Sequence, residues 1–139
     1  MALKKTDPAA VASVAKVLLL SEPAMAVAYT RAELIANSLP DSPLFPALRN
    51  SWHPQVSGDV QYALKPNWMF ASTLNVVTHG SPYAYDTHVP LLVYAPNWYK
   101  PGRVDSPVFI TSIALTLAQL LGVAPPPAAD GKVLPVQAR

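Results

Sequence analysis

The stretch AMAVAYTRAE, residues 24–33, decides the class of fold that this sequence adopts. Its first six residues form a short apolar run after Pro23, which is typical of a buried strand. The last four, from Thr30 to Glu33, have the spacing of a capping box, in which threonine and glutamate each satisfy a backbone N–H at a helix start. The sequence therefore predicts a strand that passes directly into a helix.

Upstream of this stretch, a helix is predicted over residues 8–20. Asp7 and Pro8 are suited to the N-cap and the first helical position. The apolar residues on the expected core face are Val11, Val14 and Leu18. Asp7, Pro8 and Lys16 interrupt the apolar run, which favours an amphipathic helix over the hydrophobic segment of a signal peptide.

Downstream, period-2 alternation predicts a strand over residues 59–64, and a brief apolar run predicts another over residues 90–94. The clearest helix begins at Thr111 and ends at Gly122, a residue type favoured at helix C-termini. Its expected core residues are Ile113, Leu117, Leu120 and Leu121. The proline-rich tail over residues 123–139 is expected to form a surface strap or a frayed end.

Alternating strands and helices predict an α/β architecture with a mainly parallel sheet, but three strands are too few for a complete sheet covered on both faces. We therefore expect an incomplete three-layer α/β/α unit that forms one partial domain over residues 1–139. The composition agrees, because 51% of the residues are hydrophobic and only 13% are charged. Such a chain is expected to self-associate or to lack an N-terminal portion that covers its apolar faces.

Charge and composition argue against several classes of function. The net charge of +2 comes from scattered residues without a Lys/Arg cluster, so binding of a nucleic acid polymer is not supported. No run of about 18 apolar residues occurs, so a membrane-spanning helix is not expected. The sequence contains no cysteine, which excludes disulfides and thiolate metal sites.

The polar loop over residues 78–90 concentrates the groups that carry chemistry. It contains two histidines, an aspartate and two tyrosines: His79, His88, Asp86, Tyr83 and Tyr85. Imidazole is a common zinc ligand, and the glycine after His79 lets the backbone pass close to an ion. The two histidines lack the spacing with which one helix presents both to the same ion. From the residues alone, the loop is either a metal or acid–base site or a loop with hydrogen-bonded histidines.

Three segments resemble, in the same order, segments of the alkaline phosphatase superfamily of the phosphodiesterase and nucleotide pyrophosphatase-related type. They are SGDV at 57–60, HGSPYAYDTHVPLL at 79–92 and ITSIALTLAQLLG at 110–122. The resemblance covers roughly residues 23–134 and implies an alkaline-phosphatase-like fold. Ser112 and Leu115 stand where the family usually has aspartate and proline, which affects helix capping rather than chemistry.

This family uses two zinc ions in its complete site, and the resemblance implies that His79 binds one of them. For His88 and Asp86 we expect hydrogen bonds that orient the loop rather than metal ligation. Tyr83 and Tyr85 are candidates for lining the substrate cleft, or they pack beside the loop. The family's Thr or Ser nucleophile and its Asp-x-x-x-His and Asp-His motifs have no counterpart here, so no catalytic residue is assigned.

The resemblance therefore implies the C-terminal portion of a phosphomonoesterase or phosphodiesterase whose substrate is a phosphate ester. Because one histidine cannot hold zinc, we expect the chain alone to retain neither ion and to be inactive. The alternative is a non-catalytic interaction module derived from the same fold. Members of this type are commonly exported, which implies a periplasmic or secreted parent. His53 matches no ligand position of the family.

Overall fold

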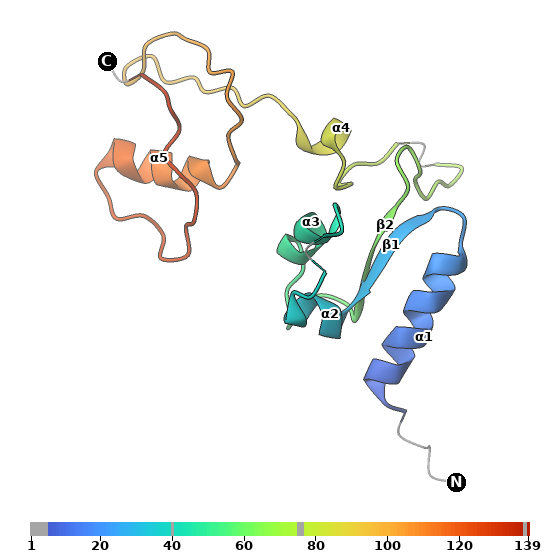
Figure 1. Cartoon of the computed structure of the whole chain (residues 1–139). Helices are drawn as coiled ribbons and strands as arrows, with labels where there is room; N and C mark the ends of the chain where they lie inside the picture. Colours follow the sequence, from blue (N-terminus) through green and yellow to red (C-terminus); the bar gives the residue numbers. More distant parts are fainter. Residues whose placement is uncertain (1–5, 40, 75–76, 138) are drawn as a thin grey trace. The chain divides into compact units, whose positions relative to one another are not determined.

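The computed structural model describes residues 6–39, 41–74, 77–137 and 139. The chain forms two compact units, which divide between Pro90 and Leu91. Within the described residues, unit 1 contains the strands β1 and β2 with helices α1 to α4, and unit 2 contains helix α5 (Figure 1). The expectation of a single partial domain over residues 1–139 stays a prediction.

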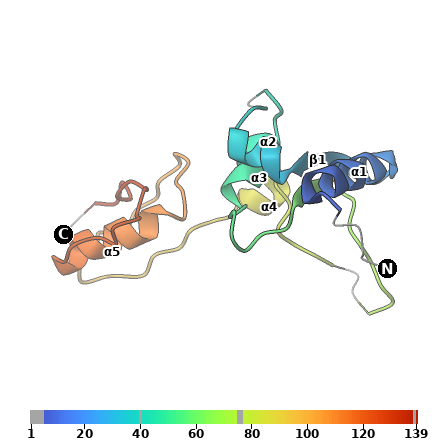
Figure 2. The ribbon, with the colours of Figure 1, turned by 90° about the horizontal axis from the view of Figure 1, so that it is seen from below.

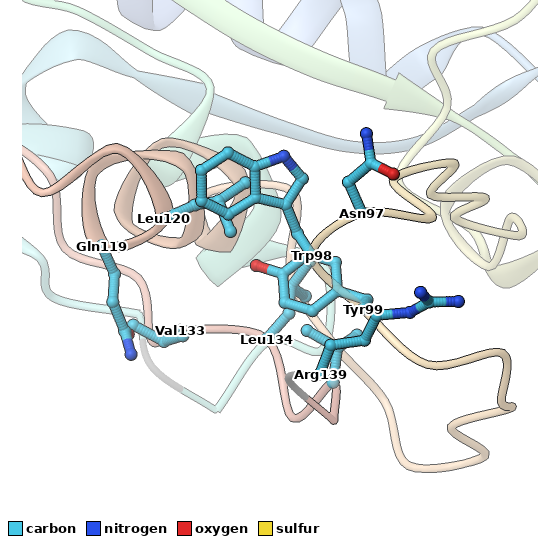
Figure 3. A pocket seen from close by; sticks show the side chains of 9 residues that line it. Asn97, Trp98, Tyr99, Gln119, Leu120, Val133, Leu134 and Arg139 are labelled. Atoms are coloured by element: carbon cyan, nitrogen blue, oxygen red, sulfur yellow. The ribbon is translucent and has the colours of Figure 1, made fainter.

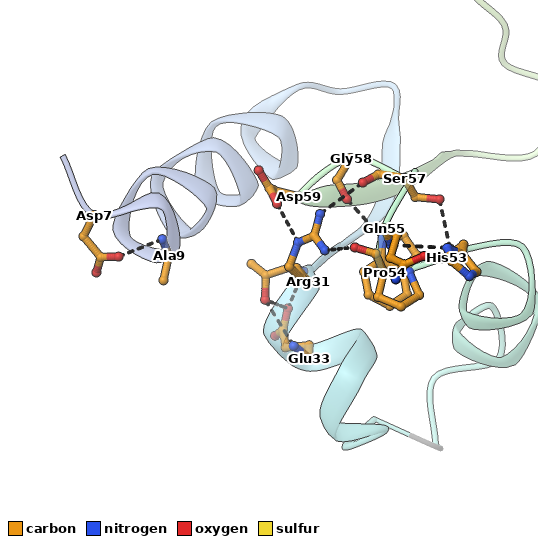
Figure 4. Close-up of polar contacts among 12 residues, drawn as sticks. Asp7, Ala9, Arg31, Glu33, His53, Pro54, Gln55, Ser57, Gly58 and Asp59 are labelled. Carbon is orange, nitrogen blue, oxygen red and sulfur yellow. Dashed lines mark hydrogen bonds and ion pairs between the residues drawn. The ribbon is translucent and has the colours of Figure 1, made fainter. Parts of the chain in front are cut away.

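Helix α1 spans Pro8–Ser21, close to the predicted range. The Asp7 carboxylate accepts a hydrogen bond from the N–H of Ala9 at 3.1 Å (Figure 4). Pro8 lies in the first turn, where its missing N–H leaves no helical bond unmade. The local signals for the start of this helix are confirmed.

The core face of α1 differs from the predicted one. The predicted core residues are exposed: Val11, Val14 and Leu18. The helix instead packs on β1 with Ala12 buried, and Lys16, one turn further along, forms an ion pair with Glu33 at 2.5 Å. Because an alanine and a polar contact hold the helix, its valine and leucine stripe faces solvent. No helix in the described part of the chain, α1 included, is long and apolar enough to cross a membrane.

Strands β1, Met25–Thr30, and β2, Val60–Leu64, pair in a two-stranded sheet. Both strands lie where the sequence predicts them. The predicted parallel direction is wrong for this pair, because the strands run antiparallel with Ala28 opposite Tyr62. In Figure 1 the two strands lie between α1 and helix α3, Phe45–Asn50, and in Figure 2 β1 runs alongside α1, against which it packs.

The antiparallel direction follows from contacts that Arg31 makes where the chain leaves β1 and enters β2 (Figure 4). The Arg31 N–H donates to the carbonyl of Asp59 at 2.8 Å, and its Nε donates to the Asp59 carboxylate at 2.6 Å. Its terminal nitrogens donate to the carbonyls of Pro54 and Ser57, and its guanidinium lies 5.5 Å from the ring centre of Trp52. These five residues, here called the Arg31 clamp, hold the end of β1 beside the start of β2. The chain must therefore return in the opposite direction.

Helix α2, Arg31–Ala36, begins with the predicted capping box. Thr30 accepts a hydrogen bond from the N–H of Glu33, and the Glu33 carboxylate accepts one from the N–H of Thr30 at 2.8 Å. Partial burial raises the pKa of the Glu33 carboxyl, but hydrogen bonds from Lys16 and Thr30 outweigh it and leave the pKa below its ordinary value. The cap and the ion pair to α1 therefore share one carboxylate.

The core of unit 1 lies between the sheet and helices α2 and α3. Its buried side chains are Tyr29, Leu34, Phe45, Leu48, Trp52 and Ala63. The rings of Tyr29 and Phe45 meet edge to face with centroids 5.1 Å apart, an arrangement that aromatic pairs favour. Trp52 also donates its indole N–H to the carbonyl of Gly58 at 3.0 Å, so the core is joined to the loop before β2.

In unit 2, helix α5 spans Ser112–Leu121, the range predicted from the sequence. Gly122 ends the helix with φ of +64°, the left-handed conformation in which glycine has no steric penalty. Thr111 is the N-cap residue, as predicted, but its side chain makes no capping hydrogen bond.

The buried face of α5 only partly matches the predicted one. Its buried residues are Ser112, Thr116 and Ala118, whereas Leu117 and Leu121 are exposed. Residues 131–137, here called the strap, fold back over this side, where the Thr116 hydroxyl accepts the N–H of Leu134 at 2.9 Å. A Cβ at Gly131 would lie 2.6 Å from the carbonyl carbon of Thr111, so only glycine fits there. These residues match the strap alternative, whereas the assignment of residues 123–139 as one tail stays a prediction.

The strand predicted over residues 90–94 is not formed in the described structure. Leu92 and Tyr94 are 90% and 93% exposed. A strand needs a hydrogen-bonded neighbour, and the sheet found among the described residues consists of β1 and β2 alone. The apolar run has the composition of a buried strand without a partner strand to pair with.

Replacing Phe45 by alanine should lower the free energy of unfolding by about 3–5 kcal/mol, because it leaves a cavity in the core. Phe45 is 1% exposed, whereas Phe109 is 75% exposed and serves as the matched control. Urea denaturation followed by circular dichroism measures both changes. We expect the Phe109→Ala change to stay within about 0.5 kcal/mol. Equal costs at the two positions would contradict the core described above.

Replacing Thr30 by alanine should cost about 1 kcal/mol, because the capping box of α2 loses its hydroxyl. Thr111→Ala is the matched control, since Thr111 is also an N-cap residue but makes no capping hydrogen bond. Thermal and urea denaturation of the two variants give the comparison. A larger loss at Thr111 than at Thr30 would argue against this account of capping.

Candidate functional site

The loop over residues 78–90 follows β2 in unit 1 and contains the short helix α4, Ala84–Thr87. Gly80 has φ of +89°, a backbone conformation that L side chains rarely adopt. This glycine therefore determines the direction in which the chain leaves His79. His79 itself is exposed on the loop.

Two tyrosines attach this loop to the end of β2. The Tyr83 hydroxyl donates to the carbonyl of Leu64 at 2.7 Å, and the Tyr85 hydroxyl accepts the N–H of Asn67 at 3.2 Å. Their rings stack with centroids 5.6 Å apart and an interplanar angle of 25°. Burial, and then the neighbouring Tyr85, raise the pKa of the Tyr83 hydroxyl. Both residues thus hold the loop in place, and Tyr83 also lines a cleft.

Asp86 closes the loop on itself. Its carboxylate accepts the N–H of Ser81 at 2.8 Å. The Ser81 hydroxyl first, then the Ser81 N–H and the charge of His79, lower the pKa of the Asp86 carboxyl. The Ser81 hydroxyl is buried and makes no hydrogen bond of good geometry, so the N–H contact is the one that closes the loop.

His79 lines a cleft of about 640 Å³ that lies wholly within unit 1. Its walls come from α3, from β2 with Lys65, from residues 68–70 and from residues 78–83 together with Thr87. We call this space the His79 cleft. The sequence predicts a cleft near the loop but does not identify residues 68–70, because a spacing pattern does not show which separated segments meet.

The other two histidines lie outside this cleft. His88 is exposed at the end of α4, where its backbone N–H donates to the carbonyl of Ala84 at 2.9 Å. In His53, the backbone N–H donates to the Ser57 hydroxyl at 2.9 Å, and Nδ1 accepts the N–H of Gln55 at 3.2 Å (Figure 4). His53 therefore stabilises the turn before β2.

The described residues do not form a complete metal site. Nowhere among them do three or more histidine, cysteine or carboxylate side chains come together. A structural zinc needs about four protein ligands and a catalytic zinc about three. His79, with Asp86 as its acidic neighbour, falls short of either set, and its role as a ligand stays a prediction.

Unit 2 has a cavity of its own, of about 340 Å³ (Figure 3). It lies between α5, the strap and the segment that contains Trp98 and Tyr99. The N–H of Arg139 donates to the carbonyl of Trp98 at 2.9 Å and holds the end of the chain beside this cavity. None of the candidate site residues of the loop lines it.

No family model matches the chain. It is 31% identical over 115 residues to alkaline phosphatase PafA of Elizabethkingia meningoseptica, a match covering 82% of this chain and 20% of PafA. It is 32% identical over 108 residues to alkaline phosphatase PhoK of Sphingomonas, covering 69% of this chain and 19% of PhoK. A calcium-transporting ATPase of Myroides odoratus is 36% identical over 76 residues, which are 53% of this chain and 14% of that protein.

The chain thus spans about a fifth or less of the length of these relatives. A solved structure agrees with the sequence matches. The crystal structure of wild-type PafA superposes with a TM-score of 0.81 at 28% identity, covering 94% of this chain and 25% of PafA. The predicted alkaline-phosphatase-like α/β fold is confirmed by this likeness. By sequence and by structure, the chain belongs to the alkaline phosphatase superfamily.

Proposed function

We propose that this chain is the C-terminal portion of a metal-dependent phosphate-ester hydrolase, in which His79 supplies one zinc ligand. The observation that carries the proposal is that His79 lies on a loop fixed by protein contacts and lines a cleft large enough for a small molecule. The relatives named as alkaline phosphatases support the class of substrate.

Residues outside this chain would complete the zinc site. When bound, zinc polarises a phosphoryl oxygen and stabilises the charge on the leaving oxygen. The chain's own part is to hold the His79 imidazole at the cleft through Tyr83, Tyr85 and the Asp86–Ser81 contact. The nucleophile would belong to the rest of the longer protein, so we expect no turnover by this chain alone.

The exposed stripe of α1 fits a role as part of a larger fold. Val14, Val17 and Leu18 are 60%, 68% and 63% exposed, although they are residue types usually found in a core. We propose that another portion of the longer protein covers this stripe. Self-association, or use of the fold as a non-catalytic interaction module, are the alternatives that the same stripe supports.

In the longer protein, His79→Ala should lower both zinc content and turnover of a chromogenic phosphate ester. Loss of a partner that only orients a ligand lowers metal affinity or activity by about 10–100-fold. Loss of the ligand itself should lower them at least as much. Elemental analysis measures zinc independently of activity, and steady-state kinetics at saturating zinc measure turnover.

His88→Ala is the matched control for this experiment, because His88 lies on the same loop but does not line the cleft. We expect a milder effect on both measurements. Zinc-dependent turnover by the isolated chain would refute the proposal. So would a longer protein whose zinc content and turnover are unaffected by losing His79.

Acid should release the Ser81 N–H from Asp86. Since the pKa of the Asp86 carboxyl is lowered, this contact is complete above the ordinary carboxyl pKa of about 4 and is lost as pH falls through the lower folded value. The Ser81 amide proton shift, followed by NMR against pH, should show this transition. Asp86→Asn should abolish it while leaving the Ala9 amide, which donates to Asp7, unchanged. An unaltered Ser81 titration in this variant would contradict the assignment.

A further inference from the structure

One wall of the His79 cleft is aromatic. Tyr62, Trp68 and Phe70 line it, and the rings of Tyr62 and Phe70 meet edge to face with centroids 6.4 Å apart. These three residues are 41%, 53% and 66% exposed, so part of their apolar surface is open to water. Covering such a surface with a flat apolar group is favourable, because it removes that area from water and adds ring-to-ring contact.

The charges that line the cleft suit an anion. Among the described residues that line the cleft, the basic ones are Lys65 and His79. No carboxylate belongs to the lining among the described residues, although Asp86 lies just outside it, where it binds the N–H of Ser81 and interacts with His79. A dianionic phosphate in the cleft is therefore attracted to Lys65, and its attraction to His79 is reduced by the nearby Asp86 carboxylate.

The volume of the cleft points to an organic ligand rather than to inorganic phosphate. At about 640 Å³ it lies within the range of roughly 300–1,000 Å³ typical of small-molecule sites. A phosphate group fills only a small part of that space. The remaining part borders on the aromatic wall, which offers few hydrogen-bonding groups.

We infer that the His79 cleft binds the aromatic alcohol group of a phosphate ester, with the phosphate directed toward Lys65 and His79. The placement of the phosphate rests on the proposed function. The placement of the aromatic group rests on the ring contacts and exposure of the aromatic wall. The inferred substrate class is thus aryl phosphate, or an ester whose alcohol carries a flat ring.

The test uses the full chain and the indole N–H signals in NMR titrations with phenyl phosphate, phenol and methyl phosphate. Phenyl phosphate should shift the signal of Trp68 but not that of Trp98, which lies in unit 2. It should bind several-fold more tightly than methyl phosphate. Phenol should shift the same signal more weakly.

Two substitutions test the contributions of the aromatic ring and of the phosphate separately. Phe70→Ala should weaken phenyl phosphate by roughly 2- to 10-fold, the range expected for loss of one aromatic contact. Phe109→Ala, at a ring 75% exposed in unit 2, should leave binding unchanged. Lys65→Gln should weaken the binding of phenyl phosphate and leave the binding of phenol unchanged.

The outcomes distinguish failure of the inferred aromatic subsite from failure of the proposed function. No shift at Trp68, equal affinity for methyl and phenyl phosphate, or no effect of Phe70→Ala would each overturn the inference. If the expected shifts and variants are observed while His79→Ala leaves zinc and turnover of the longer protein unchanged, the proposed function fails and the aromatic subsite stands.

Discussion

The Arg31 guanidinium is the group on which the rest of unit 1 depends. An arginine offers five N–H donors in a rigid plane, and here they reach one carboxylate and two backbone carbonyls while the plane lies near Trp52. The ion pair with Asp59 alone is a weak source of stability, because the two side chains are 35% and 59% exposed. The carbonyl contacts add more, because they satisfy backbone groups of a loop that lacks regular structure. A lysine at this position lacks the planar fork and cannot make all of these contacts.

The clamp also determines where the candidate site lies. By holding the start of β2 beside the end of β1, it sets the pairing of the two strands and therefore the position of Leu64 at the far end of β2. The carbonyl of Leu64 is the acceptor for Tyr83, and the turn after it supplies the N–H that reaches Tyr85. The Arg31 clamp at the start of β2 thus helps to determine where the His79 loop lies at the other end of that strand.

The sequence predicts well those features that adjacent residues determine. The caps at Asp7 and Thr30 and the glycine at 122 depend on neighbours within four positions, and each is present as predicted. The direction of the strands depends on Arg31 meeting Asp59, 28 residues away. The buried face of α5 depends on Leu134 reaching Thr116. Periodicity contains no information about such distant partners, which is why these predictions are wrong or incomplete.

The candidate site also combines features that adjacent residues determine with features that depend on distant contacts. The motif singles out His79, whose role as a ligand stays a prediction. The aromatic wall and the hydrogen bonds of Tyr83 and Tyr85 become visible only when separated segments come together. These tyrosine contacts have a consequence for metal binding. The loop is held by the protein's own hydrogen bonds, so His79 does not need an ion to order it. A ligand that is already positioned loses less conformational entropy when the ion binds. His79 therefore has a defined position on its loop, and what a metal site there would need is further ligands beside it, since no group of three or more candidate ligands forms among the described residues.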